Sequence, residues 1–187
     1  HGGEDGGAVA NDGSLEKDIN LEIAKKLQNI LNLYGVEVIM TRTSDISIYD
    51  DGITSIKKKK ISDIHNRFKI IEENPNSLFV SIHQNKFQSE KQFGTQVFYS
   101  KNTASSKRLA QCIQESVVGS LQPENKRVVK PTGTEIYLLY HAHSTAVLVE
   151  CGFVSNDEEL SKLKDNDYQT AIAVSIANGI IKYSNDG

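Results

Sequence analysis

Apolar residues recur along much of the chain at the spacing of a buried helix face. In residues 15–34 they stand three or four positions apart, which predicts a helix with Ser14 as its N-cap and Gly35 placed to end it. Three later segments repeat this spacing and predict further helices: residues 61–71, 104–121 and 168–183. Each of these helices should bury one face against a common core.

Short apolar runs between the helices predict strands. Residues 78–82 and 146–149 are compact and rich in β-branched side chains, which is typical of strands buried on both faces. Three less marked runs also predict strands: residues 36–41, 94–99 and 134–139. Residues 44–56 have no clear period and contain Asp50, Asp51 and Gly52, so we expect them to form an exposed excursion.

The alternation of strands and helices predicts an α/β fold, a three-layer α/β/α sandwich around a mostly parallel, mixed central sheet. The 187 residues, 38% of them hydrophobic, are enough for one sizeable core, and we expect a single domain over 1–187. The chain opens within a Gly-rich loop, residues 1–14. We therefore expect a first strand upstream of His1, together with any leader peptide that is removed from the mature protein.

Charge and cysteine content narrow the possible partners. With 21 basic and 24 acidic residues, the net charge of −3 gives no broad field that would attract nucleic acid or an anionic membrane. No apolar run has the length of a bilayer span. Cys112 and Cys151 lie in apolar segments and are expected to be buried, unpaired thiols. Recognition should therefore occur at a local site.

Ionisable residues follow the two most apolar predicted strands. His83 comes directly after residues 78–82, and Glu150 comes directly after residues 146–149. In open α/β sheets the loops beyond the carboxyl ends of the strands converge above the sheet and form the site. The strand expected before His1 would end at the same edge. We therefore expect His1, His83 and Glu150 to meet at one rim.

Two imidazoles and a carboxylate form a ligand set that suits zinc, and a hydrolytic zinc site uses three protein ligands and one open position. Glu16, which follows the Gly-rich loop directly, is the candidate ligand beside His1 and His83. Such a zinc lowers the pKa of a bound water and polarises a substrate carbonyl. Glu150 would then carry the proton from the water to a leaving amine. Taken singly, each residue is more often a polar cap or an ion-pair partner.

Other residues that could bind a metal or a phosphate fit such a site less well. His141 and His143 form an i, i+2 pair that could clamp a metal, but they fall in the connection before residues 146–149 and are expected to belong to a loop beside the substrate groove. The glycines within residues 2–7 match neither a phosphate loop nor a dinucleotide fingerprint. We expect them to let the backbone approach the metal closely.

The chain resembles the type-3 family of zinc-dependent N-acetylmuramoyl-L-alanine amidases in six segments that keep the family's order. These segments are HGGEDGGAV (1–9), LEKDINLEIAKKL (15–27), VIMTRTSD (38–45), FVSIHQN (79–85), GTQVFY (94–99) and AVLVECGFVSNDEE (146–159). The resemblance implies one catalytic amidase domain with zinc on His1, Glu16 and His83, and with Glu150 as catalytic residue. It also implies cleavage of the amide bond between N-acetylmuramic acid and L-alanine in peptidoglycan. Gln84 departs from the small residue that usually follows the second histidine.

Residues 59–79 and 133–153 are similar to the sporulation-specific branch of this family, which acts in making the muramic-δ-lactam of the spore cortex. This similarity implies an extracytoplasmic enzyme that acts on a glycan strand with its stem peptide and serves cortex maturation and germination. If a protein activator is needed, we expect it to bind at residues 45–60. Two alternatives remain: another zinc peptidase that cleaves within the stem peptide, and a catalytically weak wall-binding or partner-binding protein.

Overall fold

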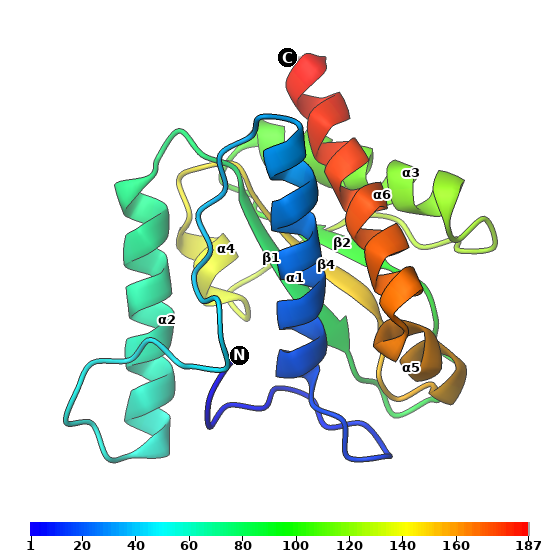
Figure 1. The fold of residues 1–187 in the computed structure, drawn as a ribbon. Helices are drawn as coiled ribbons and strands as arrows, with labels where there is room; N and C mark the ends of the chain where they lie inside the picture. The colour runs from blue at the N-terminus through cyan, green and yellow to red at the C-terminus, as the bar shows by residue number, and fades with distance from the viewer. Residues whose placement is uncertain (187) are drawn as a thin grey trace.

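A mixed β-sheet forms the centre of the molecule, and helices cover both of its faces (Figure 1). The computed structural model describes residues 1–186. Within them the sheet has the strand order β1-β4-β2-β3, with β1 at Phe79–Asn85, β4 at Ala146–Phe153, β2 at Gln96–Tyr99 and β3 at Lys130–Pro131. The pairs β1/β4 and β2/β3 are parallel, and β2/β4 is antiparallel. The predicted mostly parallel, mixed sheet is confirmed.

Six helices are formed by the described residues: α1 (Glu16–Leu33), α2 (Ile56–Glu73), α3 (Ala104–Ser120), α4 (Tyr137–His141), α5 (Asp157–Lys164) and α6 (Asn166–Asn185). Helices α1, α3 and α6 share one apolar cluster with the sheet, whereas α2 and α4 share a second cluster with it. The three-layer α/β/α arrangement is therefore confirmed. Along residues 1–186 no helix is both long enough and apolar enough to cross a membrane.

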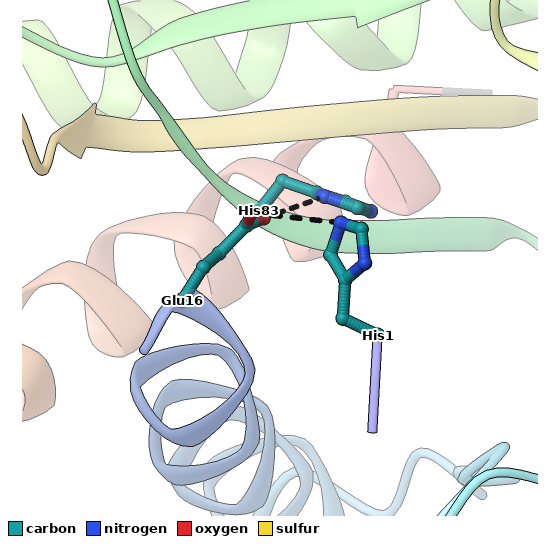
Figure 2. Close-up of side chains that lie close together, drawn as sticks. All are labelled: His1, Glu16 and His83. Atoms are coloured by element: carbon teal, nitrogen blue, oxygen red, sulfur yellow. Dashed lines mark hydrogen bonds and ion pairs between the residues drawn. The ribbon is translucent and has the colours of Figure 1, made fainter. Parts of the chain in front are cut away.

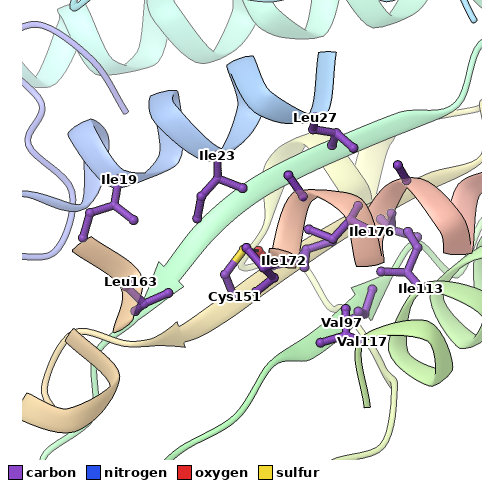
Figure 3. Close-up of a cluster of buried hydrophobic side chains, with 14 of the residues drawn as sticks. Ile19, Ile23, Leu27, Val97, Ile113, Val117, Cys151, Leu163, Ile172 and Ile176 are labelled. Carbon is purple, nitrogen blue, oxygen red and sulfur yellow. Dashed lines mark hydrogen bonds between the residues drawn. The ribbon is translucent and has the colours of Figure 1, made fainter. Parts of the chain in front are cut away.

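Strand β4 separates the two apolar clusters because successive side chains point to opposite faces of a sheet. Val147, Val149 and Cys151 pack into the larger cluster beneath α1, α3 and α6, part of which is drawn in Figure 3. Ala146 and Leu148 point the other way, toward α2 and α4. A shift of one residue in register would exchange the two sets, so burial on both sides fixes the register of β4. Cys151 and Cys112 are buried free thiols, as predicted.

The predicted helices are all present, although several boundaries differ. Helix α1 begins at Glu16, with Leu15 rather than Ser14 at its N-cap, and Gly35 follows its end with a φ of 74°. Helix α2 begins at Ile56, five residues before the predicted start at 61. The prediction from sequence missed the short strand β3 and helix α5, since both are too short to show a periodic pattern.

Two predicted strands are wrong. Residues 134–139 were expected to be a strand, but helix α4 occupies Tyr137–His141 and buries Leu138 and Leu139 in the second apolar cluster. Two adjacent buried leucines suit a short helix packed on a sheet better than an alternating strand. Residues 36–41 form no regular secondary structure and join no strand of the described sheet.

A cavity of about 810 Å³ lies between residues 36–41 and the central sheet. It is lined by these residues on one side and by the open edge of β1 on the other, with parts of α1 and α2 completing its walls. Its apolar lining includes Leu27, Val38, Ile64, Val80 and Ile82. Strand β1 pairs with β4 along its other edge. Residues 36–41 therefore have no neighbouring strand within the described residues with which to form a ladder.

Candidate active site

The loop before α1 folds back over the first turn of that helix. The backbone N–H of Glu16 donates to Ala8 O at 2.9 Å, and the N–H of Lys17 donates to Gly6 O at 3.1 Å. These bonds use two of the N–H groups that a helix start otherwise leaves without partners. They also return the chain to the rim of the sheet. His1 consequently lies beside Glu16, as Figure 2 shows.

His1, Glu16 and His83 form a compact cluster at this rim. His83 Nδ1 lies 2.8 Å from Glu16 Oε1, and His1 Nε2 lies 3.5 Å from Glu16 Oε2 (Figure 2). One ligand atom from each residue lies within 4.8 Å of the others. Ligand atoms around a tetrahedral zinc stand roughly 3.3–3.5 Å apart, given metal–ligand distances of about 2.0–2.2 Å. The three predicted ligands do meet, and their donor set suits a metal ion such as zinc.

Glu16 is held as an acceptor of several hydrogen bonds. Its side chain is almost completely buried, and its oxygens accept from the backbone N–H of Ala8 at 2.7 Å and of Gln84 at 3.1 Å. Burial alone would raise its pKa, but the hydrogen bond and charge of His83, the charge of His1 and the Ala8 N–H together lower that pKa to about 2. Glu16 is therefore ionised across the physiological pH range, as a carboxylate metal ligand must be.

Asp5 orients the imidazole of His1. Its Oδ2 lies 2.8 Å from His1 Nδ1, while its Oδ1 accepts from Lys60 Nζ at 2.8 Å. Partial burial raises the pKa of Asp5, but the hydrogen bonds from Lys60 and His1 outweigh this effect and lower it to about 2. An ionised Asp5 keeps the proton of His1 on Nδ1 and leaves Nε2 free to face Glu16, as carboxylate–histidine pairs do at zinc sites. The prediction from sequence missed Asp5. Its spacing of four residues from His1 within one loop was the only signal.

Gly7 is required by the close approach of the loop to this cluster. Its φ of +68° lies in the left-handed region, which disfavours side chains. An added Cβ would lie 2.5 Å from Glu16 Oε2 and 2.8 Å from His1 Cδ2. Both the backbone conformation and the lack of space therefore exclude any larger residue. At this position a glycine does let the backbone approach the candidate ligands closely, and the expected close approach to a metal stays a prediction.

Glu150 lies opposite His83 in the parallel pairing of β4 and β1, so both side chains leave the sheet on the same face. Both predicted strands extend beyond these residues, to Phe153 and Asn85, so the expectation that each strand ends before its ionisable residue is wrong. A polar residue does not end either strand, because the backbone ladder continues through it. The sheet edge nevertheless brings Glu150 to the rim that carries His83.

One carboxyl oxygen of Glu150 is shielded from solvent. Part of the residue remains accessible, but its Oε2 is buried and has no hydrogen-bond partner among the described residues. Burial, and then the nearby charge of Glu16, raise the pKa of Glu150 to about 8. A carboxyl with such a pKa can hold or release a proton near neutral pH, as a general acid–base group must. A cation bound nearby would favour its ionised form.

This pKa predicts how the stability of the metal-free protein depends on pH. Because the pKa of Glu150 is about 8 in the folded state and near 4.5 when unfolded, the folded state binds the proton more tightly, and stability falls as pH rises between these values. Glu150→Gln removes this contribution. Relative to the parent, we expect the free energy of unfolding of the variant to rise by about 2–3 kcal/mol between about pH 5.5 and about pH 8. Urea unfolding of chelator-treated protein measures this free energy. If it depended on pH equally in the parent and the variant, the prediction would be contradicted.

The other histidines lie away from the cluster. His141 belongs to α4, where its ring stacks on Tyr137 with centroids 4.4 Å apart, and His143 is exposed in the following loop. Among the described residues, His141 and His143 belong to no group of three or more side chains that could hold a metal ion. His65 on α2 also contacts Tyr137. None of the three is part of the candidate metal centre.

Residues 45–60 pack against the loop that carries His1. Asp45 accepts from the Gly3 N–H and from Lys17 Nζ, and Lys59 Nζ pairs with Glu4 at 2.9 Å. Residues 45–60 are thus exposed on their outer side and contact the opening loop on their inner side.

Comparison with known proteins agrees with this geometry. The sequence profile of the Amidase_3 family, described as N-acetylmuramoyl-L-alanine amidase, matches residues 1–182. The chain is 36% identical over 183 residues to the germination-specific N-acetylmuramoyl-L-alanine amidase of Bacillus subtilis, and the match covers 98% of this chain and 76% of that protein.

Solved structures show the same fold. The CwlD amidase of Clostridioides difficile, determined in complex with the GerS lipoprotein, matches with a TM-score of 0.96 and 41% identity, covering 100% of this chain and 95% of that one. The amidase AmiC2 of Nostoc punctiforme matches with a TM-score of 0.81 and 28% identity, covering 99% of this chain and 93% of that one. With its profile match, its relatives and its fold in agreement, the chain belongs to the Amidase_3 family of N-acetylmuramoyl-L-alanine amidases.

Proposed function

We propose that this chain cleaves the amide bond between the lactyl group of N-acetylmuramic acid and L-alanine of peptidoglycan, with one zinc ion held by His1, Glu16 and His83 and with Glu150 as the catalytic residue. The observation that carries the proposal is the meeting of two imidazoles and a buried carboxylate from distant parts of the chain, on the rim that also carries Glu150. Membership of the family supplies the reaction class.

Each residue has a distinct task in this reaction. A zinc ion supplies Lewis acidity toward the scissile carbonyl and lowers the pKa of water. Glu150 takes a proton from the attacking water as the C–O bond forms, and passes it to the alanine nitrogen as the C–N bond breaks. The products are a lactyl carboxylate and a free amine. Asp5 holds His1 in the tautomer whose Nε2 faces the centre.

Product analysis tests the reaction. Peptidoglycan digested by the purified, zinc-loaded protein should yield stem peptides that begin with a free L-alanine amine, and muramic acid with an intact lactyl carboxylate. Mass spectrometry of the products distinguishes this cleavage from the alternatives. New amines within the stem peptide would identify a zinc peptidase instead, and an undigested wall with bound protein would identify a wall-binding protein.

We also propose that the enzyme acts outside the cytoplasm, on the spore cortex, where removal of the stem peptide precedes formation of the muramic-δ-lactam. The support is the similarity to a germination-specific amidase and to CwlD. In this sequence of reactions the enzyme removes only the peptide, and a separate deacetylase must act before the lactam closes. Cortex from spores without this enzyme should contain no muramic-δ-lactam, and a normal lactam content would overturn the assignment.

We further propose that a protein partner binds at residues 45–60. The CwlD structure contains the GerS lipoprotein, and in the present chain the outer side of this segment is exposed, including Ile56, Lys57 and Lys58. Charge reversal at Lys57 and Lys58 should weaken binding of a GerS-like lipoprotein in a pull-down of purified proteins. Unchanged binding would count against this surface.

The amidase domain is proposed to include a strand on the amino side of His1, next to the open edge of β1. The cavity between β1 and residues 36–41 has the apolar lining that an inserted strand requires. If a strand fills this cavity, a protein extended on the amino side of His1 should unfold at a higher temperature than the chain beginning at His1. An unchanged melting temperature would contradict the proposal.

A further inference from the structure

Two buried amide side chains lie behind the Glu16 carboxylate. Asn20 stands one turn after Glu16 in α1, and Gln84 follows His83 in β1; their exposed fractions are 6% and 3%. Asn20 Nδ2 donates to Glu16 Oε1 at 3.1 Å, and Gln84 Nε2 donates to Asn20 Oδ1 at 3.2 Å. The sequence motifs assign no task to this pair, and the reaction does not consume or release a proton there.

Hydrogen-bond chemistry fixes the direction of both amides. A carboxylate offers only acceptor atoms, so Asn20 must turn its NH2 group toward Glu16 and its carbonyl toward Gln84. Gln84 must then present its own NH2 group to Asn20. The direction of both hydrogen bonds that link Gln84 to Asn20 and Asn20 to Glu16 is thus determined. Each amide is held in one orientation by its neighbour.

We propose that Asn20 and Gln84 are positioning residues that aim the Glu16 carboxylate at the metal, with Gln84 acting through Asn20. The inference rests on the zinc centre proposed above. The structure gives Glu16 Oε1 one side-chain donor outside the ligand set, Asn20, together with the backbone N–H of Gln84. His83 also donates to this oxygen here, and a histidine that binds zinc through the same nitrogen no longer can.

An uncharged donor suits this position. An amide holds the carboxylate in a fixed direction without bringing a positive charge near the metal, whereas a lysine or arginine would compete with the ion for the carboxylate. Partners that orient a metal ligand in this way typically contribute about 10–100-fold to metal affinity. The buried Gln84–Asn20 pair is therefore expected to act on zinc binding more than on folding.

The test is the zinc dissociation constant, measured by competition with a chromophoric chelator and not by turnover. Asn20→Leu and Gln84→Met remove the amides with little change in side-chain size. We expect Asn20→Leu to weaken zinc binding by about 10–100-fold and Gln84→Met by about 3–10-fold. If Asn20→Leu does not fold, Asn20→Ala carries the same expectation. The absorption spectrum of the cobalt-substituted protein should change in both variants.

Matched controls separate positioning from a general loss of stability. Asn125 and Gln114 are equally buried amides that both donate to Thr95 O, remote from Glu16 in the hydrogen-bond network. Asn125→Leu and Gln114→Met should lower the melting temperature but keep the zinc affinity and the cobalt spectrum of the parent.

The double variant tests whether Gln84 acts on Glu16 through Asn20. If Gln84 acts through Asn20, adding Gln84→Met to Asn20→Leu should change zinc affinity by less than about twofold. Fully additive effects, or effects no larger than those of the Asn125 and Gln114 controls, would overturn the positioning role while leaving the zinc centre intact. A parent protein that binds no zinc would overturn the centre itself, and this role with it.

Discussion

Glu150→Gln is expected to lower the rate of amide hydrolysis by at least about 10²–10⁴-fold, the range that a positioned acid–base group contributes, while zinc remains bound. Gln has nearly the same size as Glu but can neither accept the proton of the attacking water nor deliver it to the alanine nitrogen. The three candidate metal ligands are untouched by this change. Turnover of muropeptides and zinc content, measured on the same sample, decide the outcome.

Glu159 offers a matched control for that variant. It is also a buried glutamate, and a single oxygen, Oε2, accepts from the backbone N–H groups of Gly94 and Phe153. Gln retains one such acceptor oxygen, so Glu159→Gln should keep most of the activity. If Glu150→Gln hydrolysed muropeptides at the rate of the parent, the proposed role of Glu150 in proton transfer would be wrong.

His83→Ala is expected to abolish both zinc binding and turnover. His83 comes from the central sheet and contacts Glu16 directly, so its removal leaves two of three protein ligands and breaks the cluster. The loss in zinc affinity should exceed the roughly 10–100-fold that follows from removing a residue that only orients a ligand. Elemental analysis of the purified variant measures bound zinc.

His143 provides the control, since it is exposed in a loop away from the cluster. His143→Ala should retain the zinc and the turnover of the parent. Glu150→Gln and His83→Ala together separate proton transfer from metal binding. Glu150→Gln is expected to lose the reaction and keep the metal, whereas His83→Ala is expected to lose both. A His83→Ala protein with a full complement of zinc would show that the metal lies elsewhere.

Helices and buried strands were predictable because their signals are local. The spacing of apolar residues in 15–34 reports one buried face, and α1 buries Ile19, Ile23 and Leu27 on that face. The compact run 146–149 reports burial on both sides, and β4 is buried on both. Neither inference needs knowledge of the neighbouring element, because each pattern reflects only how many of its own faces are covered.

Residues 36–41 and 134–139 show where such local reasoning fails. Both segments have the composition of strands, but a strand also needs a partner to form its ladder. Residues 36–41 face a cavity instead of a neighbouring strand, and Leu138 and Leu139 find burial in a short helix above the sheet. Tertiary contacts, which no single segment encodes, decided both cases.

The sequence by itself determined that His83 and Glu150 follow the two most apolar runs and that His1 and Glu16 flank the Gly-rich loop, and hence that these four residues were the candidates for chemistry. Only the tertiary structure decided what surrounds them: the Asp5 carboxylate on His1, the amides of Asn20 and Gln84 behind Glu16, and the shielding of Glu150. The reason is physical. Residue identity sets which atoms can bind a metal or a proton, but burial and hydrogen-bond direction, which fix their orientation and pKa, arise from segments far apart in the chain.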